Sequence, residues 1–424
     1  MRVLVVGAGI GGLTTALSLH QAGIETLVVD AAVRLRPLGV GINLLPHAVR
    51  ELTELGLGGA LAELGVPTAE MVHFDRHGGR IWGDPRGRAL GYAWPQYSIH
   101  RGELQMLLLD TVRERLGQGA VRTGTLYKGF EQDGDSVRAR LLDRASGTTE
   151  SVAADVLVGA DGLHSAVRAQ LYPGEGAPLW NGIRMWRGVT EGEPFLTGRT
   201  LAVAGSNAAA KMVVYPISMR AERRGKALLN WVAEVRVPGD PLRRSADWNR
   251  DGRLEDVLPH FAGWRFGWLD IPALLAGAER ILEYPMVDRE PVDRWTFGRV
   301  TLLGDAAHPM YPIGSNGGSQ AVLDARALAY RLATAATPEE GLLGYEEERR
   351  DAANAVVLAC RDMPAERVLR LVAERAPHGF AAIEDVLTPE ELTAISGAYL
   401  RTSFTDVESL NTRPSYTVAR PARF

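Results

Sequence analysis

The run Val3-Leu4-Val5-Val6-Gly7-Ala8-Gly9-Ile10-Gly11-Gly12 opens the chain and decides how its first domain folds. Its four consecutive apolar residues predict a parallel strand that is buried on both faces. The Ala- and Leu-rich segment that follows predicts a helix ending near Gly23, and Thr26–Asp30 predicts a second strand. Strand, glycine turn, helix and strand together make a βαβ unit that ends on an acidic residue.

Each glycine in this turn has its own physical reason. Gly7 makes the tight turn, Gly9 lets a pyrophosphate approach the backbone, and Gly12 lets the helix pack closely on the strand. Asp30 can accept hydrogen bonds from a ribose, and its charge argues against a 2′-phosphate there. A lone GxGxxG could be a chance glycine-rich turn, but here the strand, the helix and the acid supply the context of a dinucleotide site.

A second strand-to-helix turn lies much later, over residues 299–320. Val300–Leu303 predicts a short buried strand that stops on Gly304-Asp305, and a helix is expected from about Asn316. The N-terminus of that helix favours negative charge. Gly317-Gly318 has no side chain to keep a flat ring away from the backbone, so an anion or an electron-rich ring is expected at this turn.

Further candidates for ligand contacts precede this turn. Asp155–Val158 predicts another buried strand, which runs into the Gly-x-Asp-Gly motif at Gly159 and then a helix. Gly39 and Gly41 suit backbone that passes close under a flat ligand, although a plain connecting turn could have the same glycines. Arg101 begins a predicted helix and can reach a phosphate, the alternative being a surface ion pair.

The composition narrows the class of protein. A chain of 424 residues is too long for one ordinary core, so two domains or one domain with a large insertion are expected. A net charge of −4 gives no reason to expect nucleic acid or an anionic membrane as partner. A single cysteine, Cys360, excludes a disulfide framework, a CxxC pair and a cysteine-rich metal site, and no metal site is predicted. With no room for a signal peptide before the first strand and no apolar run of ~18 residues, a soluble cytoplasmic protein is expected.

The middle of the chain changes character. Between residues 176 and 290 the pattern predicts a mostly antiparallel sheet with one face towards the ligand, built from the strand-like runs Ile183–Val189, Lys211–Ile217, Ala227–Val235 and Ile281–Asp288. A helix over Leu254–Phe261 interrupts them, and Ala202–Lys211 is expected to be a wall of the pocket. Arg76–Pro95 predicts a polar hairpin with exposed aromatics that leaves the first domain. Residues beyond 350 predict helices and, from Thr412, a loose tail.

The three motifs Gly7–Gly12, Gly159–Arg168 and Gly304–Gly318, in this order, resemble the class A single-component flavoprotein aromatic hydroxylases, the para-hydroxybenzoate hydroxylase-like family. Within it the chain is similar to the phenazine-1-carboxylate and 5-methylphenazine-1-carboxylate monooxygenases. The stretches that carry this second likeness are Pro37–Asn43, Tyr97–Leu109, Met185–Thr190, Ala246–Phe261 and Tyr284–Glu290.

The resemblance implies an α/β fold: a Rossmann-like FAD-binding domain of the glutathione-reductase type, with an inserted antiparallel β-sheet substrate domain and C-terminal helices. We expect the FAD-binding domain over 1–175, with the hairpin excursion at 76–95, and its return segment over 291–350. The substrate domain is expected over 176–290, and a C-terminal helical segment and tail over 351–424.

The resemblance also assigns residues to FAD. Gly7, Gly9 and Gly12, with Ile10 and Gly11 between them, would cradle the pyrophosphate. The other implied contacts are Asp30 on the adenosine ribose, Arg101 on the phosphate side, Leu126 at the adenine, Asp161 near flavin and pyridine nucleotide, Asp305 on the ribityl chain, and Gly41, Ile42, Gly317 and Gly318 at the flavin ring.

The chemistry implied by the family is aromatic hydroxylation, with or without decarboxylation. NADH or NADPH would visit as a transient hydride donor, because no second GxGxxG follows a strand, and O2 would react to give a flavin C4a-hydroperoxide. No side chain need act as an acid or base, and His308 is expected to be a hydrogen-bonded loop histidine. Tyr311 and Pro312, on the loop before the second helix, are the better candidates for a pocket that holds a small planar aromatic substrate. Tyr215 and Trp231 could stack on such a substrate and Arg187 could meet a carboxylate, although residues of these three kinds on strands more often belong to the core or the surface.

Three alternatives stay open at this point. The same chemistry could act on another ring, such as a salicylate-like acid or a polyketide. A flavoprotein reductase would share the motifs but would place no oxygen from O2 in its product. A non-enzymatic flavin-binding protein would not need the open helix terminus at Gly317. No stable membrane association is expected, and the protein could be a monomer or a homodimer.

Overall fold

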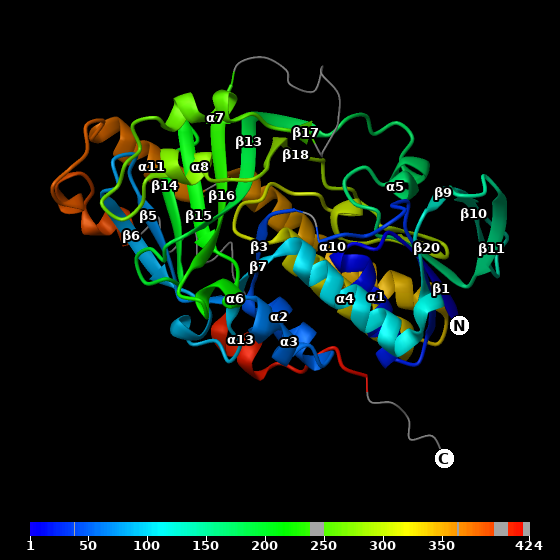
Figure 1. Cartoon of the computed structure of the whole chain (residues 1–424). Helices are drawn as coiled ribbons and strands as arrows, with labels where there is room; N and C mark the ends of the chain where they lie inside the picture. The colour runs from blue at the N-terminus through cyan, green and yellow to red at the C-terminus, as the bar shows by residue number, and fades with distance from the viewer. Residues whose placement is uncertain (38, 238–249, 363, 394–405, 419–424) are drawn as a thin grey trace.

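The computed structural model describes residues 1–37, 39–237, 250–362, 364–393 and 406–418. Two large sheets divide the molecule into two halves (Figure 1). One half holds the N-terminal βαβ unit and the long helices α4, α9 and α10, and the other holds the green strands β13–β16. None of the helices described is long and apolar enough to cross a membrane.

The first half is organised on a six-stranded sheet. Its order is β19 (Thr296–Phe297), β20 (Val300–Leu302), β12 (Val156–Gly159), β1 (Arg2–Val6), β2 (Glu25–Val29) and β8 (Val121–Arg122). All neighbours pair in parallel except the edge strand β19. The predicted strands at both glycine motifs are confirmed, since Val3–Val6 and Val300–Leu302 are buried in this sheet.

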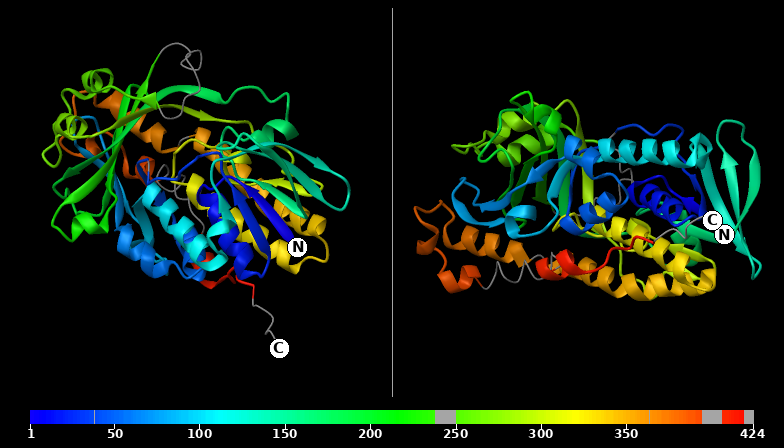
Figure 2. Two further views of the ribbon diagram at one scale, coloured as in Figure 1. Left: turned by 45° about the vertical axis from the view of Figure 1, so that its right-hand side comes forward. Right: turned by 90° about the horizontal axis from the view of Figure 1, so that it is seen from below.

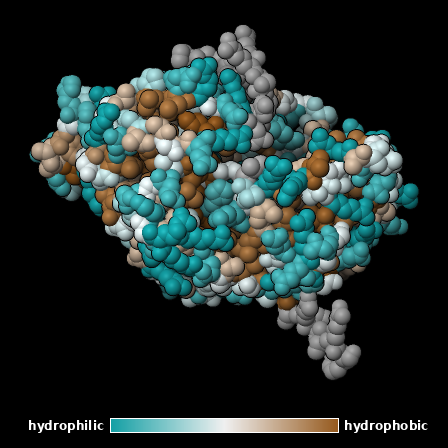
Figure 3. All heavy atoms as spheres, in the orientation of Figure 1, coloured by the Kyte–Doolittle hydropathy of each residue, from teal (hydrophilic) through white to brown (hydrophobic). Residues whose placement is uncertain are grey.

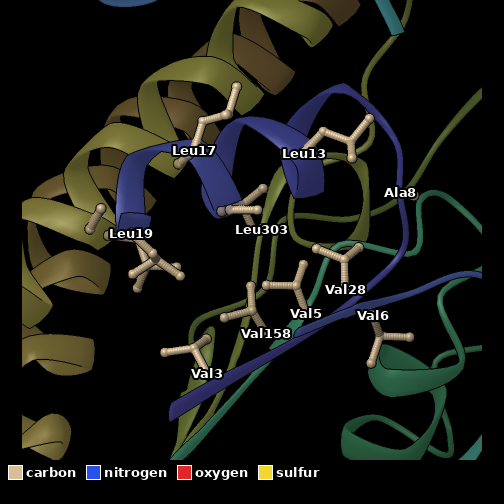
Figure 4. Packing of buried hydrophobic residues seen from close by; sticks show 14 of the residues in the cluster. Val3, Val5, Val6, Ala8, Leu13, Leu17, Leu19, Val28, Val158 and Leu303 are labelled. Atoms are coloured by element: carbon tan, nitrogen blue, oxygen red, sulfur yellow. The ribbon is translucent and has the colours of Figure 1, made fainter. Parts of the chain in front are cut away.

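Long helices cover this sheet. They are α1 (Ile10–Gln21), α4 (Arg101–Leu116), α9 (Gly317–Thr334) and α10 (Pro338–Asp362). Figure 4 shows Leu13 and Leu17 of α1 in the same packed cluster as Val3 and Val5 of β1 and Leu303, the residue after β20. Because all five are at most 1% exposed, the two glycine turns are fixed to one rigid core.

A small antiparallel sheet extends the same half. Its strands are β9 (Thr125–Gln132), β10 (Val137–Asp143) and β11 (Thr149–Ala154). It projects from the edge of the molecule in Figure 1, and its inward residues Tyr127, Ala139 and Val152 belong to the core of the first half. Buried and exposed residues alternate along β10, as is typical of a strand with one face on the core.

The second half is an eight-stranded sheet. Its order is β17 (Arg250–Asp251), β18 (Ile281–Asp288), β13 (Leu179–Gly192), β16 (Ala227–Arg236), β15 (Ala210–Pro216), β14 (Thr200–Gly205), β5 (Glu70–Phe74) and β6 (Arg80–Pro85). Its neighbours are antiparallel except β14 and β5. The sheet therefore takes two strands from residues 70–85, far from the other six in sequence.

Different helices pack on the two faces of this sheet. On one face, α7 (Leu254–Phe261) and α8 (Ile271–Ala276) form a core with Trp186 and Trp231. On the other face, α11 (Pro364–Arg375) packs Val368, Leu369 and Val372 against the strands. Figure 2 shows α10 leading towards α11, which lies at the far end of the molecule beside β5 and β6.

Short elements join the halves. A second small sheet has the order β3 (Gly41–Leu44), β7 (Gln96–His100), β4 (Val66–Thr68). The remaining helices and turns are α2 (Pro46–Glu54), α3 (Gly58–Leu64), α5 (Ala166–Leu171), α6 (Met219–Glu222), α13 (Val407–Thr412) and the 3-10 turns Gly87–Leu90, Gln118–Ala120, Gly304–Ala306 and Ile383–Asp385. The face of the molecule in Figure 3 mixes hydrophilic and hydrophobic residues without a continuous apolar band.

Two local expectations are wrong because the C-terminal segment hydrogen-bonds to the rest of the protein. The aromatics of Arg76–Pro95 were expected to be exposed, yet Tyr92 is buried, because Asn411 of α13 hydrogen-bonds to Gly91 and Ala93 on either side of it. The segment from Thr412 was expected to be a loose tail, yet the hydroxyl of Tyr416 donates to Glu348 at 2.6 Å and Arg326 Nη2 donates to Thr417 at 2.9 Å. As far as residue 418, the C-terminal segment thus packs across the first half of the molecule.

Candidate active site

A cavity of about 450 Å³ lies between the two halves and gathers most of the predicted site residues. The first half lines it with Gly9–Gly11, Gly41–Asn43, Arg101, Gly304–Asp305 and Met310–Gly318. The eight-stranded sheet lines the opposite side, with Val203, Val213 and Val232 among others. Segments separated by hundreds of residues in sequence thus meet at one site.

The first glycine turn is built to hold a phosphate group. Gly7 has φ +108°, and a Cβ there would lie 2.4 Å from the carbonyl oxygen of Ala160. A Cβ on Gly12 would lie 1.9 Å from the carbonyl oxygen of Gly7, so helix α1 can begin this close only with glycine. A Cβ on Gly9 would meet no atom within 4 Å, which leaves open space beside the backbone.

The start of α1 has free hydrogen-bonding capacity. Its N-cap residue, Gly9, provides no side-chain cap, and its first turn contains no acidic residue. The first N–H groups of a helix have no partner within the helix, so they can bind an anion such as a pyrophosphate. Gly9, Ile10 and Gly11 line the cavity, whereas Gly7 and Gly12 support the turn from behind.

Asp30 stands at the end of β2, directly beside this turn. Its Oδ2 accepts a hydrogen bond from the N–H of Ala8 at 2.8 Å, and its Oδ1 accepts one from Ala32 at 2.8 Å. An ionised carboxylate can accept further bonds, so a ribose hydroxyl can still be held there. Asp30 and the half-buried Leu126 of β9 lie outside the lining of the central cavity.

The second helix N-terminus faces the same cavity. Asn316 is the N-cap of α9 without a side-chain cap, and the first turn contains no acidic residue. A Cβ on Gly317 would meet only Asp305 Oδ1, at 3.8 Å, and one on Gly318 only Ile42 Cδ1, at 3.7 Å. The non-glycine residue Ser315 has φ +62°, a strained conformation at the entry to the helix. Together these features leave the N–H groups of α9 open to an electron-rich ring edge.

Asp161 makes its hydrogen bonds at the start of α5. Its Oδ1 accepts from the Ser165 hydroxyl at 2.5 Å, and its Oδ2 accepts from the N–H of Ala166 at 2.7 Å. The carboxylate therefore caps α5, while the neighbouring Ala160 and Gly162 line the cavity.

Arg168, on the helix that Asp161 caps, supports the turn Gly304–Ala306 after β20 from behind. Its Nη1 donates to the carbonyls of Ala306 and Ala307 at 3.0 and 2.7 Å, and the side chain is 2% exposed. Glu175 forms an ion pair with its guanidinium. The motif Gly159–Arg168 thus connects two strand ends of the sheet.

A buried polar network holds the turn after β20. His308 Nε2 lies 2.5 Å from Asp324 Oδ2, Arg349 Nε donates to Asp324 Oδ1 at 2.9 Å, and the N–H of Gly304 reaches Asp324 at 3.1 Å. Burial opposes ionisation of Asp324, but His308 and Arg349 outweigh it and hold the pKa of the carboxyl below its usual value. His308 is therefore hydrogen-bonded on one nitrogen, as expected, and does not line the cavity.

Four of the five substrate-side candidates do line the cavity. The hydroxyl of Tyr215 and Nη2 of Arg187 both donate to the carbonyl of Gly41, at 3.0 and 2.7 Å. Tyr311 and Pro312 come from the loop before α9, and burial raises the pKa of the Tyr311 hydroxyl to about 12. Tyr311 is therefore neutral near pH 7.

Trp231 does not reach the cavity. It is fully buried on the opposite face of the sheet, where its Nε1 donates to Thr190 at 3.2 Å. Residues alternate across a strand, so Val232 and Glu234 of β16 face the cavity instead.

Sequence reasoning missed the polar residues of the far wall. His73, Lys211, Glu234 and Glu366 all line the cavity and are buried. The alternation of β15 and β16 would have marked Lys211 and Glu234 as facing residues of neighbouring strands, since they are direct partners in the ladder. Only Lys211 fell within a segment that was expected to be pocket wall.

A family model described as an FAD binding domain matches residues 1–185 and 271–359. Phenazine 1,6-dicarboxylic acid hydroxylase of Lysobacter antibioticus is 50% identical over 399 residues, which covers 94% of this chain and 96% of the relative. The chain belongs to the FAD-dependent aromatic hydroxylases.

Two further relatives agree with this family. This chain is 37% identical over 363 residues to the 3-amino-4-hydroxybenzoate 2-monooxygenase of Streptomyces platensis, which covers 82% of this chain and 84% of the relative. Its fold matches that of Klebsiella pneumoniae HpxO, solved with FAD and uric acid, with a TM-score of 0.74 and 26% identity over 95% of this chain and 96% of that one. The family uses FAD with NADH or NADPH and O2, and the two uncapped helix termini on one cavity fit this cofactor.

Proposed function

We propose that the hydroxylase inserts one oxygen atom from O2 into a phenazine carboxylate. The observation that carries the proposal is the 50% identity, along almost the whole of both chains, to a hydroxylase of phenazine 1,6-dicarboxylic acid. The cavity supports it, because its sheet side is largely apolar and charged residues stand at its ends: Arg101 and Arg187 near the glycine loops, and Lys211 at the far wall. A flat apolar ring system with a carboxylate suits such walls.

We further propose that FAD lies along the two helix termini. Gly9, Ile10 and Gly11 would bind the pyrophosphate through backbone N–H groups, Arg101 would add a positive charge, and Asp30 would hold the ribose. Asp305 would bind the ribityl chain, and Gly317 and Gly318 would donate N–H groups to the ring edge. FAD supplies, when bound, the chemistry that activates O2 with electrons from NADH or NADPH.

The chain's own residues would mainly position the substrate and exclude water. Arg187 and Tyr215 both hold the carbonyl of Gly41, so they fix the backbone of β3 at the edge of the cavity. Tyr311 and Pro312 would bound the ring on the loop side. The apolar sheet residues keep water from the reacting ring, which protects a reactive oxygen donor from wasteful breakdown.

We also propose the domain division 1–175 with 291–350 for FAD and 176–290 for substrate, to which the structure adds β5 and β6 as neighbours of β14. Cytoplasmic location, and a monomer or homodimer, remain predictions.

The test is turnover with isotope-labelled O2. Purified holoenzyme is mixed in air with NADH or NADPH, with and without phenazine-1-carboxylate or phenazine-1,6-dicarboxylate, and the product mass is measured. We expect faster nicotinamide oxidation and one labelled oxygen atom in the product. Faster oxidation without incorporation would overturn the phenazine substrate. A flavin that is reduced normally, with no stimulation by any aromatic acid, would favour a reductase.

A further inference from the structure

Three charged side chains meet in the wall of the cavity that belongs to the eight-stranded sheet. They are Lys211 of β15, Glu234 of β16 and Glu366 of α11, and none is more than 5% exposed. Lys211 Nζ lies 2.6 Å from Glu366 Oε1 and 2.9 Å from Glu234 Oε2. Charges this deeply buried are costly, so their presence in an otherwise apolar wall calls for a reason.

The cluster has hydrogen-bonding capacity to spare. Glu234 Oε2 is buried and, apart from the ammonium of Lys211 at 2.9 Å, has no hydrogen-bond donor within the part of the chain that the structure describes. An ammonium has three N–H donors, and Lys211 Nζ has these two carboxylates as its ion-pair partners among the described residues. Glu366 is already satisfied, since its Oε2 accepts from the N–H of Asn207 at 2.8 Å. One donor of Lys211 and one oxygen of Glu234 are left for a further group.

The position of the cluster sets what can reach it. Lys211 is four residues from Tyr215 on β15, about 13 Å along a strand. Tyr215 touches Gly41, next to the flavin-side loops. Between these two points, Val213 of β15 and its ladder partners Val203 and Val232 line the cavity. The apolar Met71 and Leu369 belong to the same lining. A flat ring system that lies against these residues would bring its far end to Lys211.

We infer that Lys211, Glu234 and Glu366 bind a carboxyl group at the end of the substrate's ring system that points away from the flavin. The inference rests on the proposed function and adds the residues that select the acid. Lys211 would donate its third N–H to the substrate carboxylate, and Glu234, in its protonated form, would donate a second hydrogen bond. No bond is made or broken, and only the proton on Glu234 has to be present.

The electrostatics of the cluster agree with a protonated Glu234. Burial raises the pKa of Glu234 above its ordinary value, against the opposing charge of Lys211. The other groups that face it are Glu366 from α11, whose charge adds to the rise of this pKa, and Lys211 from β15 and the side chain of Asn207, whose hydrogen bonds oppose it. His73 of β5 lies close enough to Lys211 for that charge to lower the pKa of the imidazole further, after the larger effect of burial. His73 is therefore neutral and adds no charge beside the acid.

The experiment measures selectivity for the acid over its neutral amide. Holoenzyme is titrated with phenazine-1-carboxylate and phenazine-1-carboxamide, and each Kd is read from the change in flavin absorbance. We expect Lys211→Met to weaken binding of the carboxylate by about 10-fold to 100-fold, the worth of a hydrogen bond to a charged group, and to change the amide by about 2-fold or less. Lys226→Met, which removes an exposed lysine paired with Glu193, is the matched control and should change neither Kd.

A second variant keeps the test decisive if Lys211→Met does not fold. Wild-type affinity for the carboxylate should fall as pH rises through the raised pKa of Glu234, because Glu234 must keep its proton, whereas Glu234→Gln should bind with little dependence on pH. If Lys211→Met leaves the ratio of carboxylate affinity to amide affinity unchanged, the inference is wrong. The cluster would then only hold α11 against the sheet. The same result with labelled oxygen still entering the product would leave the proposed function standing, whereas loss of all labelled product from wild type would remove both.

Discussion

Gly12 has no room for any side chain, whereas Gly9, three residues earlier, has room that only a ligand would fill. A Cβ at Gly12 would lie 1.9 Å from a backbone oxygen, so Gly12→Ala must move α1 away from β1, at a cost of about 1–3 kcal/mol or more. A Cβ at Gly9 would meet nothing within 4 Å, so Gly9→Ala should leave the unfolding free energy unchanged. Its methyl group would nevertheless stand where the pyrophosphate is proposed, and FAD affinity should fall about 10-fold.

The two glycine variants are compared by thermal unfolding and by flavin retained after gel filtration. Gly59→Ala in α3 is the control, because a Cβ there also meets nothing within 4 Å and the residue does not line the cavity. It should keep its FAD. Wild-type FAD affinity in Gly9→Ala would mean that the pyrophosphate does not pass this glycine.

Asp324 is the charged centre of the network under the turn Gly304–Ala306, and its removal should lower the unfolding free energy strongly. It is fully buried, and Asp324→Asn leaves the guanidinium of Arg349 without its carboxylate, which for a broken buried pair costs about 3–5 kcal/mol. Asp351→Asn, at an exposed residue, should change stability by about 0.5 kcal/mol or less. Urea unfolding of both variants at pH 7 measures the difference.

The pH dependence of this contribution has a definite sign. The pKa of Asp324 is lowered in the folded protein, so its contribution is present above the unfolded value of about 3.9 and is lost as pH falls through the folded pKa. Wild type and Asp324→Asn should therefore approach each other in stability below about pH 4. A constant gap down to acid pH would show that the carboxylate charge is not what stabilises the network.

At the scale of elements, α5 is the piece that ties two strand ends together. Arg168 donates from α5 to the carbonyls of Ala306 and Ala307, directly after the Gly304–Ala306 turn. Arg168→Met should leave two buried carbonyls without a partner, cost about 2–4 kcal/mol, and weaken FAD binding, because Asp305 belongs to the same turn. Glu175 keeps its second partner, Arg289, at 3.0 Å.

Arg138→Met is the matched control for this change, since Arg138 is an exposed arginine of β10 that pairs with Asp133. Its unfolding free energy and FAD affinity should stay at the wild-type values. If Arg168→Met is destabilised but binds FAD normally, the packing of α5 does not affect the cofactor site, and the predicted coupling between the two is wrong.

Elements that depend on near neighbours were predictable from the sequence. The strand at Val3–Val6, the helix at Leu254–Phe261 and the helix after Asn316 each follow from a few adjacent residues, and the structure confirms them. Trp231 could not be placed in the same way, because both faces of β16 are buried and only the register decides which one meets the cavity. Lys211 and Glu366 are 155 residues apart, so no local pattern could have paired them.

At the scale of the whole molecule, the cavity is formed by both halves, and FAD should therefore stabilise the entire fold. In the proposed arrangement the phosphate end of FAD would lie on α1 and its ring end on α9, and the opposite wall of the cavity comes from the second sheet. A ligand that binds only the folded state adds about 2.7 kcal/mol at a concentration 100 times its Kd. Removing FAD should lower the melting temperature, and returning it should raise that temperature again by an amount that grows with the logarithm of the FAD concentration.

Riboflavin distinguishes the proposed pyrophosphate site from the proposed ring site, because it carries the ring and the ribityl chain but no pyrophosphate. At concentrations matched to FAD it should restore little of the lost stability, since the N–H groups at the start of α1 would stay without an anion. Gly9→Ala should respond to FAD much as wild type responds to riboflavin. If riboflavin restored the melting temperature as fully as FAD does, the helix N-terminus of α1 would contribute nothing to binding, and the ring site at α9 alone would hold the two halves together.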